Sequence, residues 1–365
     1  MVDCCTPSSC CGGNNIDDKN YYTLPYLSTI HTPVGPIPSV SVNLSREDVV
    51  GSWKVRWNMG RMNYAIKPGL YGAGTPNEDS PVLVTANYKL SFDALRKELT
   101  AINAWILVLD TKGINVWCAA GKGTFGTEEL VKQLAATQLH QVVTHRSLIL
   151  PQLGAPGIAA HQIYKFTGFK VIYGPVRASD LPGFLAANNK ATKEMRQVNF
   201  NLVDRATVVP VEIMQAIKPS FYVLIGMALV TAIVSLSSWH MFWGRFFGFA
   251  IAYIGSVLVG TTLVPLLLPY IPSPSFTIKG WLAGLAWIAI FVQVWSLSGN
   301  SFTTPEAIGL YLLMPPVAAY LSLNFTGCTT YTSQSGVQKE MNLAIPAMGL
   351  SSILGVLIIF SSLFL

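Results

Sequence analysis

The uneven spread of charge is the feature that most constrains how this chain can fold. The chain has 365 residues, of which 24 are Lys or Arg and 18 are Asp or Glu. After Pro219 the charged residues are few: Arg245, Lys279, Glu306, Lys339 and Glu340. Because a soluble domain has about 25% charged residues, we expect a water-soluble N-terminal part joined to a C-terminal part that lies in lipid.

Five apolar stretches divide this C-terminal part. They cover roughly 219–238, 246–268, 280–298, 307–323 and 342–363. Each has about the 17–25 residues that a helix needs to cross a bilayer. The sequence therefore predicts an all-α transmembrane domain of five helices over 216–365. We expect four prolines to kink or end these helices: Pro265, Pro269, Pro315 and Pro316.

The orientation in the membrane follows from the N-terminus and the basic residues. The first residues, MVDCCTPSSCCGGNN, lack the basic lead and the apolar core of a signal peptide, so we expect the soluble part to stay in the cytoplasm. Five spans then leave the C-terminus outside. Lys218, Lys279 and Lys339 fall on the inner side and Arg245 on the outer side, as the positive-inside rule favours. The prediction is a multi-pass protein of the inner (cytoplasmic) membrane.

The soluble part has a Cys-rich N-terminal segment, residues 1–44, that we expect to be disordered or extended. From 45 to 215 continuous apolar runs alternate with helix-start signals. The predicted strands lie at 81–85, 104–110, 147–150 and 169–173, and the predicted helices begin near Ser45, Ser91, Thr127 and Ser179. This alternation predicts an α/β, Rossmann-like domain with a mostly parallel sheet covered on both faces.

One cysteine lies where such a domain binds ligands. Residues 115–122 read Asn-Val-Trp-Cys-Ala-Ala-Gly-Lys, and Cys118 follows a predicted strand at the carboxyl edge of the sheet. Cytoplasmic thiols are normally reduced, so a ligand or a nucleophile is one interpretation, and a buried structural cysteine is the other. Lys122 would lower the thiol pKa if it lies nearby. The glycine-rich run after Gly121 fits neither a Walker motif nor a dinucleotide fingerprint.

These eight residues resemble, at every position, the signature of the HgcA family, the membrane-anchored corrinoid proteins of mercury methylation. The resemblance extends over nearly all of 45–365. Other segments that carry it are 84–89, 145–154, 168–176 and 324–332. The second and third of these are also similar to the corrinoid domain of the acetyl-CoA-pathway corrinoid iron–sulfur protein.

The resemblance implies a corrinoid-dependent methyltransferase that passes a methyl group from cobalt to inorganic Hg(II), giving methylmercury. The implied cofactor is a cobalamin-type corrinoid in its base-off, Cys-on state, with Cys118 as the lower axial ligand of cobalt. Trp117, Ala119 and Ala120 would pack under the corrin, and Thr85 with the 123–127 turn would hold the nucleotide tail. The other cofactor-binding candidates are Asn87, Asn115, Val116, Gly121, Lys122, Gly123, Thr124, Gly126, Gln152 and Gly154.

The resemblance also implies partners. The chain has no cysteine run of the kind that holds an iron–sulfur cluster, so electrons must come from another protein. The implied donor is the ferredoxin-like protein HgcB, which would also deliver Hg(II). The implied methyl donor is a methylated folate or its methyltransferase. No basic stripe interleaved with aromatic residues occurs, so nucleic acid is not an expected partner.

The remaining cysteines have two interpretations each. Cys4-Cys5 and Cys10-Cys11 are either a disordered tail or a trap for a soft metal such as Hg(II). As a trap, Cys4 and Cys5 replaced by Ala would lower methylation only when mercury is scarce. Cys328, in a Thr-rich loop, is either a helix-end contact or a relay for Hg(II).

Two other functions stay open from the sequence. One is a corrinoid methyl carrier of the acetyl-CoA-pathway type that acts on another acceptor. The other is a transporter with a soluble sensor domain, although no internal repeat supports it. A corrinoid absorption spectrum that changes in Cys118→Ala would distinguish the enzyme from a colourless protein that moves a solute.

Overall fold

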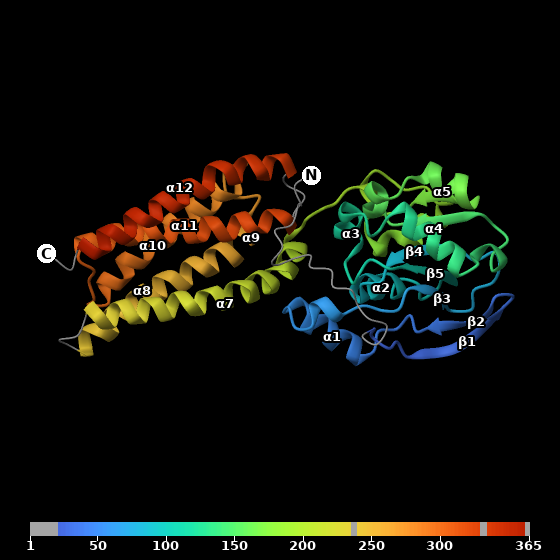
Figure 1. The fold of residues 1–365 in the computed structure, drawn as a ribbon, viewed down its shortest axis with the longest axis horizontal. Coiled ribbons are helices and arrows are strands. Elements are labelled where there is room, and N and C mark those ends of the chain that lie inside the picture. The colour runs from blue at the N-terminus through green and yellow to red at the C-terminus, as the bar shows by residue number, and fades with distance from the viewer. Residues whose placement is uncertain (1–20, 235–238, 329–333, 362–365) are drawn as a thin grey trace. The chain divides into compact units, whose positions relative to one another are not determined.

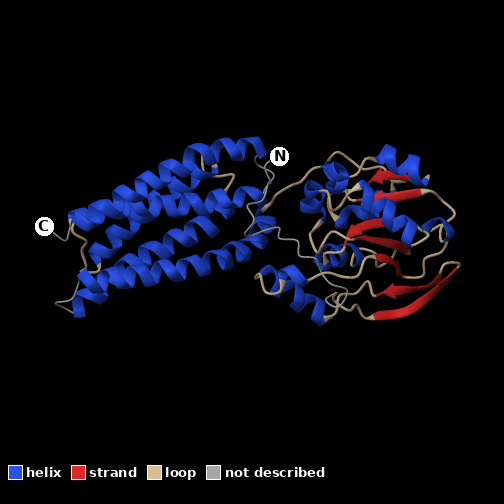
Figure 2. Cartoon of the chain, in the orientation of Figure 1, coloured by secondary structure: helices blue, strands red, loops and turns tan. Residues whose placement is uncertain are grey.

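The structure is a computed structural model that describes residues 21–234, 239–328 and 334–361. The chain divides into two compact units, an α/β unit that ends at Asn199 and a helical unit that begins at Phe200. Strands occur in the first unit and long helices make up the second (Figures 1 and 2). The predicted fold class, an α/β domain followed by a membrane-capable helical domain, is confirmed.

The α/β unit is built on a seven-stranded sheet in the order β1-β2-β3-β5-β4-β6-β7. The strands are β1 (Tyr26–Thr32), β2 (Gly35–Val40), β3 (Gly69–Ala73), β4 (Val82–Ala86), β5 (Ala104–Leu109), β6 (Ser147–Leu150) and β7 (Lys170–Tyr173). The neighbours β5, β4, β6 and β7 are all parallel. β3 runs antiparallel to β5, and β1 runs antiparallel to β2. The sheet is thus mixed, with a parallel half that carries the predicted strands.

The parallel half forms because its strands are apolar on both faces. Every residue of β4 and β5 is buried, which requires layers on both sides of the sheet. The other half was not predicted as strands. The 21–45 segment, which we expected to be extended, contains β1 and β2, and β3 contains Gly69 and Gly72. A Cβ on Gly72 would overlap the Ile30 side chain, so glycine allows this close approach.

The described residues of the α/β unit form six α-helices around the sheet. They are α1 (Arg46–Arg56), α2 (Lys89–Arg96), α3 (Val116–Lys122), α4 (Thr127–Ala136), α5 (Ala160–Thr167) and α6 (Leu181–Ala186). Short 3-10 turns are η2 (Arg61–Asn63), η3 (Leu139–Gln141), η4 (Gln152–Gly157), η5 (Ala178–Asp180) and η6 (Glu194–Arg196). The helix predicted to begin near Ser45 is confirmed as α1, and Ser45 and Asp48 form a capping box in which each side chain bonds the other's backbone. The prediction that Ser91 caps a helix is wrong, since α2 begins two residues earlier, after Tyr88.

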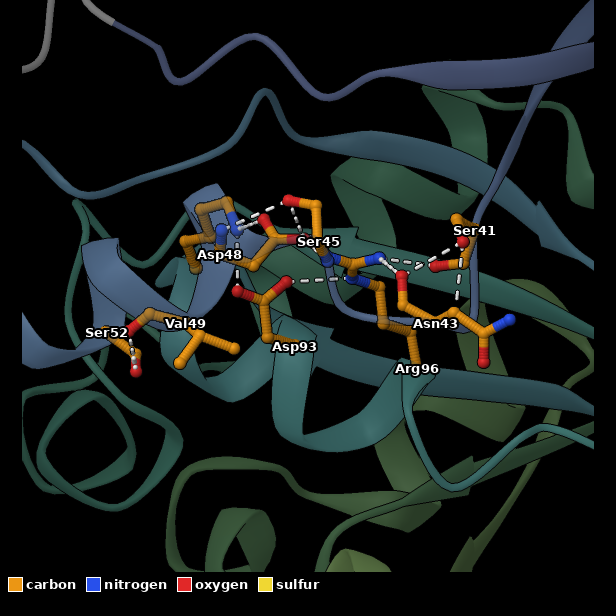
Figure 3. Close-up of polar contacts among 9 residues, drawn as sticks. Ser41, Asn43, Ser45, Asp48, Val49, Ser52, Asp93 and Arg96 are labelled. Carbon is orange, nitrogen blue, oxygen red and sulfur yellow. Dashed lines mark hydrogen bonds and ion pairs between the residues drawn. The ribbon is translucent and has the colours of Figure 1, made fainter.

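A buried cluster of four charged side chains joins α1 to α2 (Asp48, Asp93 and Arg96 are labelled in Figure 3). Lys89 Nζ lies 2.5 Å from Asp48 Oδ1 and 2.6 Å from Asp93 Oδ2. Arg96 contacts the other carboxylate oxygens of the same aspartates at 2.7 and 2.8 Å. Burial alone would raise the pKa of Asp48, but hydrogen bonds from Lys89, Ser45 and Arg96 outweigh it and hold this pKa well below its usual range.

The helical unit contains α7 (Leu202–Val234), α8 (Trp239–Leu258), α9 (Val264–Leu267), α10 (Phe276–Leu297), α11 (Thr304–Asn324) and α12 (Gln334–Ser361), with the turns η7 (Val259–Leu263) and η8 (Phe325–Cys328). Five stretches of helix in the described residues are long and apolar enough to cross a membrane: Leu202–Ile233, Phe242–Leu267, Phe276–Leu297, Thr304–Asn324 and Ser335–Ser361. This agrees with the five predicted spans. The boundary that we predicted near residue 215 falls inside α7.

The prolines act differently in two of these helices. η7, a π-helical turn, immediately precedes the short α9 that contains Pro265. This fits the chemistry of proline, which has no backbone N–H to donate to the carbonyl four residues earlier. After α9 ends, the buried Lys279 ammonium donates to the carbonyl of Leu268. Pro315 and Pro316 lie inside α11, which continues past both. Small residues bring α10 and α11 together, since a Cβ on Gly280 would lie 2.6 Å from Ala319 Cα.

Candidate functional site

The turn that leads from β5 into α3 is held by one buried amide. Asn87 is fully buried, and its Oδ1 accepts hydrogen bonds from Thr111 N, Thr111 Oγ1 and Gly113 N at 3.1, 2.8 and 3.0 Å. Its Nδ2 donates to Asp110 Oδ1 at 3.2 Å. Asn87 follows β4, so its amide fixes the turn at the carboxyl edge of the neighbouring parallel strand. These bonds hold residues 110–113, the turn that leads into α3 and Cys118.

Asn115 and Cys118 define the start of α3. Asn115 is the N-cap, and its Oδ1 accepts a 2.9 Å hydrogen bond from the backbone N–H of Cys118. Cys118 is half-buried and packs against the core of the α/β unit. Gly123, with φ of +81°, is the C-cap in the left-handed conformation that favours glycine. α3 is thus a two-turn helix with a defined beginning and end.

The two faces of α3 differ sharply. Val116, Ala119 and Ala120 are buried in the core. The other face exposes Trp117, at 39% of its surface, together with Gly121 and Lys122, and Cys118 lies at its margin. Ala119 and Ala120, which we expected beneath a corrin, contact the interior of the domain instead. The residues that a ligand can reach are the exposed ones.

Glycines hold α3 and the segment from Phe125 to Gly157 in close contact. A Cβ on Gly157 would overlap the carbonyl oxygen of Phe125 and lie 3.1 Å from Ala120 Cα. Likewise, a Cβ on Gly126 would lie 2.5 Å from the carbonyl oxygen of Gly123, and one on Gly154 would lie 2.5 Å from the Phe125 ring. Gly126 and Gly154, predicted to bind cofactor, therefore have a packing role in the fold.

A cavity of about 320 Å³ adjoins the N-terminal end of α3. Thr85, Asn115, Val116 and Trp117 are the predicted site residues that line it. Strand ends, α2 and the loop after β7 supply the remaining walls, among them Leu83, Ile149, Leu150, Ala94 and Val176. Most of this lining is apolar, so the cavity suits an apolar or aromatic group, and Arg177 is the charged residue on its wall.

The other predicted site residues lie elsewhere. Gln152 Oε1 accepts a 3.1 Å hydrogen bond from Arg196, and Thr124 Oγ1 donates to the carbonyl of Ala119 at 3.5 Å. Cys4, Cys5, Cys10 and Cys11 lie outside the described residues. The backbone of Cys328 ends η8 in the helical unit, and its side chain is also outside what is described. Within the described residues no three His, Cys, Asp or Glu side chains gather as metal ligands.

Tyr88 is a residue of this region that the sequence did not single out. It is the N-cap of α2, only 5% of it is exposed, and its hydroxyl has no hydrogen-bond partner. Burial raises its pKa; the positive charges of Arg61 and Arg56 act in the opposite direction, and the Cys118 thiol raises it further.

Comparison with known proteins relates the α/β unit to corrinoid proteins. Residues 59–185 match the model of the CO dehydrogenase/acetyl-CoA synthase delta subunit family. The acetyl-CoA decarbonylase/synthase complex subunit gamma of Methanopyrus kandleri is 35% identical over 122 residues, which are 33% of this chain and 26% of that protein. The corrinoid/iron-sulfur protein large subunit of Moorella thermoacetica is 33% identical over 125 residues, 34% of this chain and 28% of that protein.

The chain spans only about a quarter of the length of these relatives. The matched family segment begins before β3 and ends within α6, so it includes the cavity wall at β4 and β6, the Asn87 turn and α3. The relation that the sequence predicted, between this α/β domain and the corrinoid protein of the acetyl-CoA pathway, is therefore confirmed.

Proposed function

We propose that this chain is a membrane-bound corrinoid-dependent methyltransferase that transfers a methyl group to inorganic Hg(II). The observation that carries the proposal is the position of Cys118, at the margin of the exposed face of α3 and next to the cavity, in a domain similar to the corrinoid/iron-sulfur protein large subunit. The complete octapeptide around Cys118 favours mercury as the acceptor.

The residues around Cys118 fit a corrinoid. Gly121 is exposed, and a Cβ built on it meets nothing within 4 Å, so the helix surface beside Cys118 is open to a large flat ligand. The apolar cavity of about 320 Å³ would take the displaced aromatic base of a base-off corrinoid. Two polar residues on its wall, Thr85 and Asn115, are among those that the sequence predicted to bind the cofactor. Cys118 would hold the cobalt from below through its sulfur.

The corrinoid supplies a cobalt-bound methyl group, which is chemistry that no side chain provides. Cys118 contributes electronics, because a thiolate ligand donates electron density strongly to its metal, as it does in thiolate haems. That donation would favour transfer of the methyl group, with its bonding electron pair, to Hg(II), a soft metal ion that prefers soft donors. Trp117 would shield the lower face of the ring from water.

Re-reduction requires a second protein in this proposal. We assign it to a ferredoxin-like iron–sulfur protein of the HgcB type, which would also deliver Hg(II). The methyl group would come from a methylated folate or its methyltransferase. The Moorella thermoacetica relative is named as a corrinoid/iron-sulfur protein subunit, which supports an iron–sulfur partner in general.

The proposed location is the inner membrane, with the α/β domain in the cytoplasm and the C-terminus outside. Contacts within the helical unit support this orientation, because they put basic residues at the ends of the bundle where the orientation needs them. Ser275 Oγ donates to Glu340 Oε1 at 2.7 Å, so the starts of α10 and α12, with Lys279 and Lys339, share one end of the bundle. Arg245 pairs with Glu306, 3.3 Å away, where α11 begins. Lys279 and Arg245 thus occupy opposite ends, as the positive-inside prediction requires.

An alternative is a corrinoid methyl carrier that serves another acceptor. The relative from Methanopyrus kandleri favours it, because that protein is named as a subunit of an acetyl-CoA decarbonylase/synthase complex. The same Cys118 face would bind the corrinoid in either case. The acceptor is what separates the two functions.

A single-turnover assay tests the proposal. The full-length protein in detergent is loaded with isotopically labelled methylcobalamin and mixed with Hg(II), and labelled methylmercury is quantified. We expect methylmercury from the wild type and at least about a hundredfold less from Cys118→Ala, with Ser52→Ala, on α1, as the control variant. Equal methylmercury yields from wild type and Cys118→Ala would contradict the mechanism. A loaded wild type that leaves Hg(II) unmethylated would favour the carrier.

A further inference from the structure

Helix α1 (Figure 1) has apolar side chains on its outer face and a charged one on its inner face. Asp48 is 2% exposed and belongs to the buried cluster of charges described above. Val49, Val50 and Trp53, by contrast, are 47%, 51% and 63% exposed. A surface helix normally turns such residues toward the core, so this arrangement requires a reason beyond folding.

The three exposed apolar residues form one continuous strip, the α1 stripe. Val49 and Trp53 are four residues apart, and Val50 and Trp53 are three apart, which are the spacings that bring helical side chains together. The opposite face of the helix carries Asp48 and Val55, which are both buried. Grouped apolar side chains on a surface mark a place where the protein meets another molecule or a membrane.

Basic side chains border the α1 stripe. Lys54 lies one turn after Val50 on one side of it, and Arg56 lies one turn after Trp53 on the other. Arg46 precedes the two valines by one turn. All three cations are exposed. The outer face of α1 is therefore apolar along its middle and positive along both edges.

The charges of this face are free to meet an anion. In the part of the chain that the structure describes, no carboxylate forms a salt bridge with Arg46, Lys54, Arg56 or the nearby Arg61. Glu47 is the exposed acidic residue of α1. Four cations against one exposed anion make the face complementary to a negative surface.

A membrane surface fits this combination better than a protein does. Helices that lie in a bilayer interface have Trp and aliphatic residues on one face and Lys or Arg beside them, because the long basic side chains reach the phosphates while the apolar ones enter the headgroup region. Anionic phospholipids attract each such basic residue. An acidic protein partner would account for the cations but not for the exposed aliphatic pair Val49 and Val50.

A bilayer is also within reach of the α/β unit. That unit ends at Asn199, and the first membrane-capable stretch begins at Leu202. Because so short a connection ties the unit to a membrane helix, the local concentration of lipid is high, and weak binding by one short helix suffices.

We propose that α1 is a membrane-docking helix: the α1 stripe enters the headgroup region of an anionic bilayer, and Lys54 and Arg56 contact phospholipid phosphates on either side of it. Docking of this kind requires a bilayer beside the α/β unit but no corrinoid. It would hold the α/β unit at the membrane surface.

Hydrogen–deuterium exchange of the full-length protein tests this proposal. The protein without corrinoid is reconstituted into nanodiscs of phosphatidylcholine alone, or of phosphatidylcholine with phosphatidylglycerol, and exchange is followed in peptides covering 44–63. Binding to the native state alone slows exchange by the excess of docked over free protein. We expect exchange at least about tenfold slower with phosphatidylglycerol, an effect that high salt should largely remove because exposed charges are screened.

Two variants separate the apolar and the charged contributions. Trp53→Ser shortens the α1 stripe, and Lys54→Glu combined with Arg56→Glu reverses the charge of its edges. Both should abolish the slowing at 44–63, and both should melt like the wild type because these side chains are exposed. Matched changes on α5, Tyr164→Ser and Lys165→Glu, also replace an exposed aromatic and an exposed cation and should leave the slowing unchanged.

Equal exchange in the two lipids would overturn the proposal, as would a slowing that survives both α1 variants. A competing arm adds an acidic ferredoxin to the protein in phosphatidylcholine nanodiscs. If the ferredoxin slows exchange at 44–63 and phosphatidylglycerol does not, the face binds a protein and the membrane proposal is wrong. Each of these results leaves the proposed methyltransferase function intact, since no corrinoid is present.

Discussion

The side-chain oxygen of Asn115 accepts a 2.9 Å hydrogen bond from the backbone N–H of Cys118. The sulfur-bearing residue is therefore fixed by its own helix cap, three residues upstream in the chain. Asn115 also lines the cavity beside α3. One amide thus joins the geometry of the thiol to the wall of the space where a ligand would bind.

Asn115→Ala should loosen this arrangement. Loss of an N-cap costs about 1 kcal/mol, and the freed helix start would let Cys118 move. We expect roughly fivefold weaker corrinoid binding, which corresponds to about 1 kcal/mol, measured by equilibrium dialysis of the full-length protein. Asn115→Asp keeps a capping oxygen and should bind within about twofold of the wild type. Equal affinities for all three proteins would contradict the role of the cap.

Asn87→Ala should release the turn between β5 and α3. The change removes the shared acceptor of Thr111 and Gly113, and each buried donor left unpaired costs about 1–3 kcal/mol. Hydrogen–deuterium exchange of peptides covering 110–118 should accelerate at least about tenfold. Asn103→Ala, which removes the acceptor of Thr75 N in a different loop, is the control. Unchanged exchange at 110–118 would mean that the turn is held by other contacts.

Gly121→Leu should weaken corrinoid binding without lowering the stability of the fold. Nothing in the fold lies within 4 Å of a Cβ at this position, and Gly is about 1 kcal/mol less favourable than other residues in a helix. The apo variant should therefore be at least as stable as the wild type, whereas corrinoid binding should fall more than about tenfold. Gln162→Leu adds the same side chain to an exposed position on α5. Binding that survives Gly121→Leu would place the ligand on another surface.

The cluster around Asp48 should make the α/β domain sensitive to acid. The pKa of Asp48 in the folded protein is held below its unfolded value. Its contribution is therefore complete above the ordinary carboxyl pKa of about 4, and it is lost as the pH falls below that value. Asp48→Asn should cost about 3–5 kcal/mol at pH 7, because a partner of two buried cations is removed.

Thermal unfolding of the full-length protein between pH 7 and pH 3 measures this effect. The difference between wild type and Asp48→Asn should be constant above pH 5 and should narrow below pH 4. Glu128→Gln, at an exposed position of α4, should behave as the wild type throughout. A difference that grows on acidification would reverse the expected sign and contradict the ion-pair explanation.

The parallel half of the sheet was predictable because its strands are continuous apolar runs. β4, β5 and β6 lie within a residue of their predicted bounds. The other half was not, since β2 contains Pro36 and Pro38 and owes its place to pairing with β1 and β3. The five membrane-capable helices of the described residues were predictable from length and apolarity, although the charged first turns of α7 hid its true start at Leu202.

The sequence predicted where the site lies along the chain, but not which of its side chains face the core and which face outward. The octapeptide located Cys118, yet which of its residues face the core depends on helical phase and on what α3 packs against. That is why Ala119 and Ala120 are buried while Trp117 is exposed. Lys89 and Asp48 are 41 residues apart, so a local pattern could not pair them. The unpaired hydroxyl of Tyr88 depends on three-dimensional burial, which one sequence does not give.

The absorption spectrum of the corrinoid-loaded protein tests the central claim most directly. Full-length wild type, Cys118→Ala and Cys118→His are reconstituted with hydroxocobalamin, freed of unbound corrinoid and compared. We predict that the wild type retains a base-off corrinoid with a sulfur-ligand spectrum, that Cys118→Ala loses this spectrum, and that Cys118→His replaces it with a nitrogen-ligand one. Identical spectra for the three proteins, or a wild type that stays colourless, would contradict the assignment of Cys118 as the cobalt ligand.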